Sequence, residues 1–278
     1  MACSDPDYDY LRALVLDHSS NIISPARNAL FDVKLASIAR TAGADGVADL
    51  VKILRARQPQ QLHRAVAEAM TINETSFFRD VRPYKLLERQ ILPSLIEQRR
   101  PQRRLRIWSA ASSTGQEAYS LAMLLADRFP ETSSWDVQIL GTDISQKVVE
   151  YARQGRYRKL EVNRGLPASM LVRYFTREQE EWVIHNSLRA MCSFHCMNLC
   201  APISLLPIFD LVLLRNVLLY FSHEDRSIAF RSVHRNLAPD GYLLLGNSEQ
   251  ADESTDLFKV EFAEGANSFF YRPASGLQ

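Results

Sequence analysis

Residues 105–129, LRIWSAASSTGQEAYSLAMLLADRF, decide the fold because they join an apolar run, a turn of small residues and an amphipathic run. The apolar run, 105–110, predicts a buried strand, and the amphipathic run, 116–129, predicts a helix. The turn between them, 111–115, consists of small residues, which let the backbone approach a ligand closely at the helix N-terminus. This order of strand, turn and helix is typical of a nucleotide-binding unit.

The alternation of strands and helices continues towards the C-terminus. We expect strands at 137–141, 209–214 and 241–245, with a helix at 223–237 before the last of them. Because crossover helices join parallel strands, the pattern predicts an open, doubly wound α/β sheet that binds its ligand at the carboxyl ends of the strands. Residues 8–70 show only helical periodicity, which predicts a small all-helical domain.

The composition indicates a folded, globular protein. Its 278 residues are 46% hydrophobic and 23% charged, and 33 basic residues nearly balance 32 acidic ones, for a net charge of +1. This balance argues against a nucleic acid or an anionic membrane as the main partner, since both favour strongly basic surfaces. The most apolar stretch, 209–221, contains Asp210 and Arg215 and is shorter than the ~20 residues of a membrane-spanning helix. We expect a cytoplasmic protein without direct membrane insertion.

Three cysteines recur at every fourth residue, and they are Cys192, Cys196 and Cys200, with His195 among them. A zinc site is one interpretation, although metal sites usually use tighter Cys-x-x-Cys pairs on turns. We favour reduced, half-buried thiols on one face of a strand, where even spacing keeps them together. No metal is therefore expected.

The end of the second predicted strand carries a carboxylate, Asp143, 28 residues beyond Gly115. A carboxylate there can accept both hydroxyls of an adenosine ribose, although a helix N-cap is the alternative interpretation. The chain has no Walker lysine and no G-x-G-x-x-G, and Glu117 would repel a pyrophosphate. S-adenosylmethionine carries a ribose and positive charge but no phosphate, so it fits better than NAD or ATP.

Five stretches occur in the order and spacing of one family: MTINETSFFRD (70–80), RIWSAASSTGQEAYSLAM (106–123), ILGTDIS (139–145), MNL (197–199) and FDLVLLRNVLLYF (209–221). The chain thus resembles the CheR family, bacterial methyltransferases that modify glutamates of chemotaxis receptors. The resemblance implies an N-terminal all-helical domain (1–70), a linker and connecting helix (71–104), and a Rossmann-like class I methyltransferase domain (105–278). A small antiparallel β-subdomain (155–197) would be inserted into the last.

The resemblance also implies roles for individual residues. Arg79 and Tyr220 would face the transferred methyl group. Contacts with S-adenosylmethionine, or with the product S-adenosylhomocysteine, would come from Asn73, Thr75, Arg79, Ala110, Glu117, Asp143, Asn198, Leu199, Arg215 and Asn216. The residues alone favour another interpretation of 71–80, in which Thr71 and Glu74 form a helix capping box.

Two further segments carry expectations. The insertion should hold a helix at 167–174 and strands at 181–184 and 188–194, and its short polar turn argues against binding of a receptor's peptide tether. The basic cluster Arg99, Arg100, Arg103 and Arg104 favours a solvated linker over a binding site.

The implied acceptor is the cytoplasmic helical bundle of a chemoreceptor, whose glutamates would become methyl esters. In the family, the second helix meets this bundle, and here 24–41 holds only Arg27, Lys34 and Arg40 with Asp32 among them. Arg27 and Lys34 should share one face, so we expect a modest, salt-sensitive attraction. The alternatives are a methyltransferase for another protein or small molecule, and a non-catalytic cofactor-binding sensor.

Overall fold

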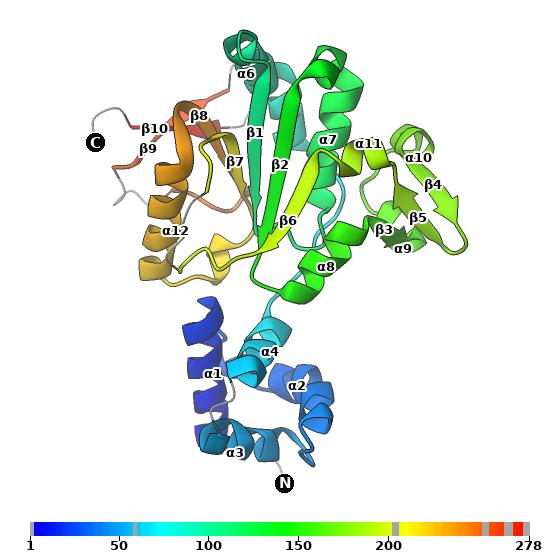
Figure 1. Cartoon of the computed structure of the whole chain (residues 1–278). Coiled ribbons are helices and arrows are strands. Elements are labelled where there is room, and N and C mark those ends of the chain that lie inside the picture. Colours follow the sequence, from blue (N-terminus) through cyan, green and yellow to red (C-terminus); the bar gives the residue numbers. More distant parts are fainter. Residues whose placement is uncertain (1–2, 58–59, 202–205, 252–255, 264–268, 275–278) are drawn as a thin grey trace. The chain divides into compact units, whose positions relative to one another are not determined.

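The computed structural model describes residues 3–57, 60–201, 206–251, 256–263 and 269–274 (Figure 1). The chain forms two compact units, and each is described by itself. The first contains residues 1–72 with 220–226, and the second contains 73–219 with 227–278. Among the described residues, no helix combines the length and the apolar composition needed to cross a membrane.

The first unit is helical, as expected. Its helices are α1 (Asp5–Ser19), α2 (Ala29–Thr41), α3 (Val47–Arg57) and α4 (Gln60–Met70), with a 3-10 turn at Pro25–Arg27. Apolar residues spaced three or four apart give each helix one buried face, and the buried set includes Leu11, Leu14, Phe31, Leu35, Leu50, Leu54, Val66 and Met70. The amide of Ile22 donates to the carbonyl of Tyr220 (2.9 Å), which ties the short second segment to this unit.

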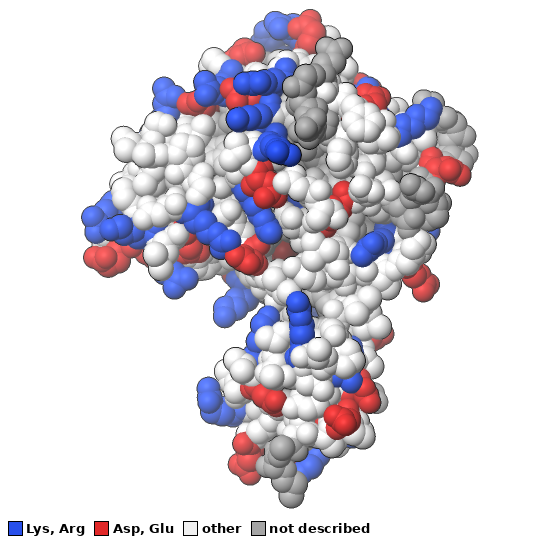
Figure 2. Space-filling model, turned by 180° about the vertical axis from the view of Figure 1, so that it is seen from behind, with Lys and Arg blue, Asp and Glu red and all other residues white. Residues whose placement is uncertain are grey.

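Lys34 on α2 is not a fully exposed cation. Lys34 is half-buried, and its Nζ donates to the carbonyl of Thr71 (2.9 Å). This burial lowers the pKa of Lys34. A carbonyl at the end of α4 thus holds the ammonium group, while the expectation that Lys34 shares a face with Arg27 stays a prediction. Elsewhere on the surface, basic and acidic side chains are interspersed on the face shown in Figure 2.

The second unit contains a seven-stranded sheet, and the doubly wound fold is confirmed. Its strands are β1 (Arg104–Ala110), β2 (Asp136–Asp143), β6 (Cys192–Cys196), β7 (Phe209–Leu214), β8 (Leu237–Leu245), β9 (Phe258–Phe262) and β10 (Phe269–Pro273). The order is β6-β2-β1-β7-β8-β10-β9, in which the first five are parallel and the last two pairings are antiparallel. Helices α7 (Gln116–Arg128), α8 (Gln146–Gln154) and α12 (His223–Asn236) connect the strands (Figure 1).

The centre of this sheet is built around Trp108. Its ring is fully buried, stacks on Phe209 with centroids 5.4 Å apart, and donates from Nε1 to the hydroxyl of Thr142 (2.9 Å). The parallel register pairs Ala110 with Thr142. The ends of β1 and β2 therefore lie side by side at one edge of the sheet.

The connecting helix contains α5 (Val81–Leu86), a π-helical turn (Leu87–Ile91) and α6 (Leu92–Arg99). Arg99 corrects the expectation of a solvated basic linker. Its side chain is 15% exposed and donates to Asp210 (2.6 Å) and to both oxygens of Asp240 (2.6 and 2.7 Å). Two carboxylates from β7 and β8 compensate for the loss of water around this guanidinium.

The insertion forms a three-stranded antiparallel sheet in the order β3-β5-β4. Its elements are β3 (Arg156–Arg158), α9 (Lys159–Val162), α10 (Ala168–Tyr174), β4 (Phe175–Glu178) and β5 (Glu181–Ile184), followed by α11 (Asn186–Arg189). The expected strand at 188–194 is wrong. The carbonyl of Met191 accepts from Ile139 of β2 (2.8 Å), so the chain from there on joins the large sheet as β6.

The cysteine pattern is only partly a strand pattern. Cys192 and Cys196 lie on β6, whereas Cys200 lies beyond its end, so the expected single face of three thiols is wrong. Burial raises the pKa of Cys192, which keeps this thiol protonated. In the part of the chain that the structure describes, no cluster of histidine, cysteine or carboxylate side chains could hold a metal ion.

Candidate cofactor site

The turn after β1 is tightly constrained. Ala111, Ser113 and Gly115 all have left-handed backbones, with φ of 61°, 50° and 91°. A Cβ on Gly115 would lie 2.9 Å from the Cβ of Ala152 on α8, so glycine is required at this close approach. The hydroxyl of Ser112 is buried and has no hydrogen-bond partner among the described residues. The turn thus offers an unsatisfied polar group at the carboxyl edge of the sheet.

Asp143 ends β2 beside this turn and is 7% exposed. Its Oδ2 accepts the amide of Ser113 (2.9 Å), and its Oδ1 accepts the amide of Ser145 (3.0 Å). Ser145, and not Asp143, is the N-cap of α8. These bonds orient the carboxylate at the carboxyl edge of the sheet, beside the turn after β1.

Arg215 lies directly after β7 and is the buried centre of a charge cluster. Its Nη1 donates to Glu117 (2.8 Å) and its Nη2 to Asp80 (3.1 Å), while only 1% of its side chain is exposed. The Nε atom is buried without a partner among the described residues. One cation between two carboxylates leaves one net negative charge, an environment that favours a cationic ligand.

The segment before α5 lies against the turn after β1. The carbonyl of Asn73 accepts the hydroxyl of Ser113 (2.8 Å). Nη2 of Arg215 also donates to the carbonyl of Arg79 (3.1 Å), and Nη1 of Arg79 donates to the carbonyl of Glu74 (2.7 Å). The capping box is wrong, because 72–76 is not helical and the hydroxyl of Thr71 donates back to Glu68 (2.7 Å).

The structure brings most of the expected residues to one edge of the large sheet. Ala110 ends β1 there, and Asn216 follows Arg215. The amide of Met197 donates to the carbonyl of Asp143 (2.8 Å), which brings the chain at Asn198 and Leu199 close to β2. Thr75 is half-buried in the segment before α5. Tyr220 belongs to the helical unit, so its place beside the others stays a prediction.

Glu249 is a site residue that the sequence reasoning missed. Its carboxylate is 4% exposed and accepts four backbone amides, from Asn216 (2.6 Å), Val217 (2.8 Å), Leu218 (2.8 Å) and Gly246 (2.9 Å). Asn216 is left-handed, with φ of 60°. Successive amides converging on an anion form a nest, so this carboxylate fixes the turn after β7.

The sequence of this chain is similar to those of known proteins over most of its length. Residues 73–266 match the family model described as "CheR methyltransferase, SAM binding domain". The chain is also 34% identical over 265 residues to "Chemotaxis protein methyltransferase 1" of Pseudomonas aeruginosa, covering 94% of this chain and 96% of the relative. The chain belongs to the CheR methyltransferase family.

One further relative and one solved structure are also similar to this chain. The "Chemotaxis protein methyltransferase" of Vibrio parahaemolyticus is 32% identical over 260 residues, covering 92% of this CheR methyltransferase and 94% of the relative. Among solved structures, the glycopeptide N-methyltransferase MtfA with S-adenosylmethionine has a TM-score of 0.35 and 16% identity, covering 61% of this chain and 59% of that one.

The cofactor of this CheR methyltransferase is S-adenosylmethionine. The residues present fit that molecule on two observations. The cluster at Arg215 has an excess negative charge for a sulfonium and an amino group. Arg215 and Ser112 each keep a buried polar atom without a partner among the described residues. Buried polar atoms usually have a partner, and a bound ligand can supply it.

Proposed function

We propose that the protein transfers the methyl group of S-adenosylmethionine to glutamate carboxylates of methyl-accepting chemotaxis receptors in the cytoplasm. The products are glutamate methyl esters and S-adenosylhomocysteine. The observation that carries this proposal is the similarity to chemotaxis protein methyltransferases over nearly the whole chain. The acceptor is the helical bundle of the receptor. Cofactor and acceptor meet at the carboxyl edge of the large sheet.

The cofactor is held by groups that converge on this edge. Asp143 accepts the ribose hydroxyls, and Glu117 and the carbonyl of Ala110 hold the amino-acid end. Asn198 and Leu199 flank the adenine. Further contacts come from Asn73, Thr75, Arg79, Arg215 and Asn216.

The chemistry needs positioning more than proton transfer. When bound, S-adenosylmethionine supplies a methyl carbon made electrophilic by its sulfonium. The accepting glutamate, with an ordinary pKa of about 4.3, is already an anionic nucleophile at neutral pH. Arg79 orients that carboxylate through a charge-assisted hydrogen bond, and Tyr220 completes the pocket. The rate enhancement comes from excluding water and from aligning the reacting atoms.

Turnover should be nearly independent of pH between about 6 and 8.5, because this range lies well above the reference pKa of glutamate, about 4.3. Burial raises the pKa of Tyr84, which lies beside Arg215, so this phenol stays neutral throughout the range. Initial rates with saturating cofactor would measure the profile. A steep limb near pH 7 would contradict the mechanism, since it would reveal a general base.

Asp143→Ala should weaken binding of S-adenosylmethionine by about ten- to thirtyfold, or about 1.5–2 kcal/mol, through loss of hydrogen bonds to a charged acceptor. Titration calorimetry would measure the affinity. Asp143→Asn is the matched variant, because its one acceptor oxygen can keep the bond with one of the two amides, of Ser113 or Ser145, and it should lose less. Unchanged affinity in Asp143→Ala would show that other residues hold the ribose.

The function itself is tested by incubating the enzyme and labelled cofactor with the cytoplasmic fragments of chemoreceptors from the same source. Mass spectrometry should find a mass gain of one methyl group on glutamate side chains. Label on another protein or a small molecule, with none on receptors, would favour the alternative of a methyltransferase for another substrate. Binding without transfer to any acceptor would favour a sensor, against which the intact set of Arg79, Glu117, Asp143 and Tyr220 argues.

A further inference from the structure

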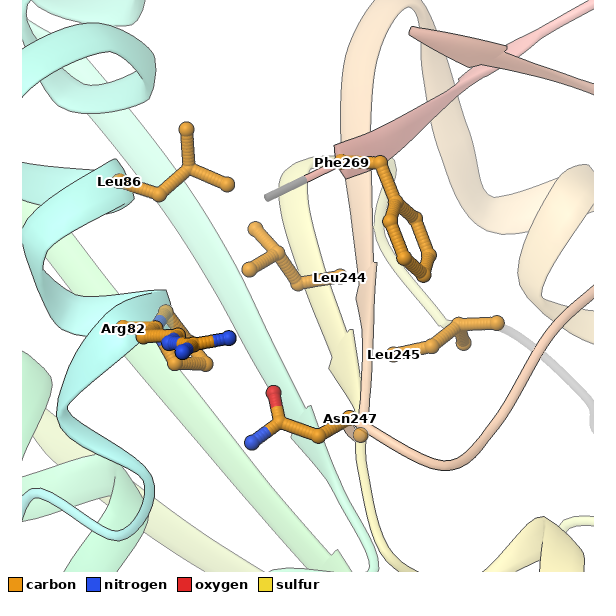
Figure 3. A pocket seen from close by; sticks show the side chains of 8 residues that line it. Arg82, Leu86, Leu244, Leu245, Asn247 and Phe269 are labelled. Carbon is orange, nitrogen blue, oxygen red and sulfur yellow. The ribbon is translucent and has the colours of Figure 1, made fainter. Parts of the chain in front are cut away.

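A hollow of about 140 Å³ opens at the carboxyl end of β8 (Figure 3). Its wall comes from α5, from the end of β8 and the loop that follows, and from β10. The lining residues are Arg82, Pro83, Leu86, Leu244, Leu245, Gly246, Asn247 and Phe269. None of them is among the residues proposed to contact the cofactor, although the amide of Gly246 donates to Glu249.

The hollow combines an apolar wall with two polar side chains. Arg82 and Asn247 point into it from the side of α5 and from the loop after β8, while Leu86, Leu244 and Phe269 supply the apolar wall (Figure 3). Neither polar side chain has a hydrogen bond or an ion pair with any described residue. A guanidinium beside an amide donor suits a carboxylate, and apolar walls suit the methylenes that carry one.

The neighbouring carboxylates do not neutralise Arg82. Asp80, two residues earlier, pairs with Arg215 (3.1 Å). Glu249, which accepts the amide of Gly246 in the hollow's wall, is saturated by four backbone amides. Among the described residues, Arg82 therefore has no carboxylate paired with it at the rim of the hollow, and a carboxylate from outside would complement it.

The hollow adjoins the turn after β7 on the side away from the ribose position. A Cβ on Gly246 would lie 3.0 Å from the amide nitrogen of Asn216, so the two segments touch. In the strand order β2-β1-β7-β8-β10, Asp143 ends β2, whereas the hollow lies at β8 and β10. The proposed ribose position and the hollow thus lie on opposite sides of β7.

We propose that this hollow binds an acidic side chain of the acceptor protein that neighbours the methylated glutamate and so contributes to the choice of glutamate. The inference rests on the proposed function. On a helix, residues three or four apart share one face, so one helical acceptor can present one carboxylate to Arg79 and a second to Arg82.

A double-mutant cycle tests this contact. Arg82→Gln is combined with acceptor fragments in which each acidic residue within one turn of the methylated glutamate is changed to its amide. Arg82→Gln should raise the acceptor KM about tenfold and leave kcat within about twofold, as loss of one partly buried charge pair predicts. One of the amide changes in the acceptor should raise KM by the same factor. Combining that change with Arg82→Gln should raise KM no further than either change alone.

Lys85→Gln is the matched control, because it removes one exposed cation from α5 without touching the hollow. It should leave KM within about twofold. Additive effects at every acceptor position would overturn the proposal. A fall in kcat with KM unchanged would overturn it as well, since Arg82 would then serve the accepting glutamate itself.

A second measurement does not depend on the receptor. Glutarate added at millimolar concentration should shift the side-chain amide resonances of Asn247 in the wild-type enzyme and in Lys85→Gln, but not in Arg82→Gln. Absence of this shift in the wild type would overturn the inference. An enzyme that methylates no receptor yet shows the shift would refute the proposed function and leave the carboxylate subsite standing.

Discussion

Replacing Arg79 with alanine should lower kcat by at least about a hundredfold while changing the Kd of S-adenosylmethionine by less than about threefold. Among the described residues, the guanidinium makes one hydrogen bond, to the carbonyl of Glu74, which leaves donors for an accepting carboxylate. The carbonyl of residue 79, which accepts from Arg215, survives the substitution. The loss should therefore fall on the acceptor, and single-turnover rates with calorimetry would separate the two quantities.

Arg164→Ala is the control for this variant. Arg164 pairs with the side chain of Glu74 in the same neighbourhood and is largely exposed, so its loss should hardly change kcat. Arg79→Lys should recover part of the rate, since it keeps the charge but not the forked geometry. If affinity for the cofactor falls in parallel with kcat, Arg79 holds the cofactor and not the acceptor.

Arg215→Met should lower the free energy of unfolding by about 3 kcal/mol, because removing one partner of a buried ion pair leaves uncompensated charge behind. The two carboxylates left behind, Glu117 and Asp80, are only 13% and 30% exposed. Methionine keeps much of the side-chain volume, so the effect is one of charge and not of a cavity. Denaturant unfolding, followed by fluorescence, would measure the difference.

Arg156→Met provides the comparison. Arg156 also bridges two carboxylates, Glu178 and Glu181, but on an exposed face of the small sheet. Its loss should change stability much less, because water screens and solvates the remaining charges. Equal losses at Arg156 and Arg215 would contradict the assignment of Arg215 as a buried anchor. A large loss of cofactor affinity in Arg215→Met would add a direct binding role.

The central βα unit could be predicted because its signals are local. The apolar run, the turn of small residues and the helix at 105–129 follow each other directly, and Asp143 ends the next strand. Likewise, the helical first unit follows from apolar spacing alone. In such cases the pattern that is visible in the sequence is itself the cause of the structure.

The features that could not be predicted depend on contacts with residues far away in the sequence. Nothing in the local sequence distinguishes Lys34 and Arg99 from solvated residues. In the structure, Lys34 donates to the carbonyl of Thr71. Arg99 donates to Asp210 and Asp240, which lie on two strands. The segment at 188–194 alternates like a strand, but only its later part finds β2 to pair with. Sequence periodicity carries no information about these partners, which can be identified only from the three-dimensional structure.

The contacts of Glu249 determine when one part of the protein can fold during synthesis. The turn that it holds begins at Asn216, 33 residues earlier in the chain. A growing polypeptide that has emerged from the ribosome only as far as Leu218 exposes three amides, of residues 216–218, before Glu249 has been made. This corner of the cofactor edge therefore closes only after β8 and the loop behind it have been synthesised.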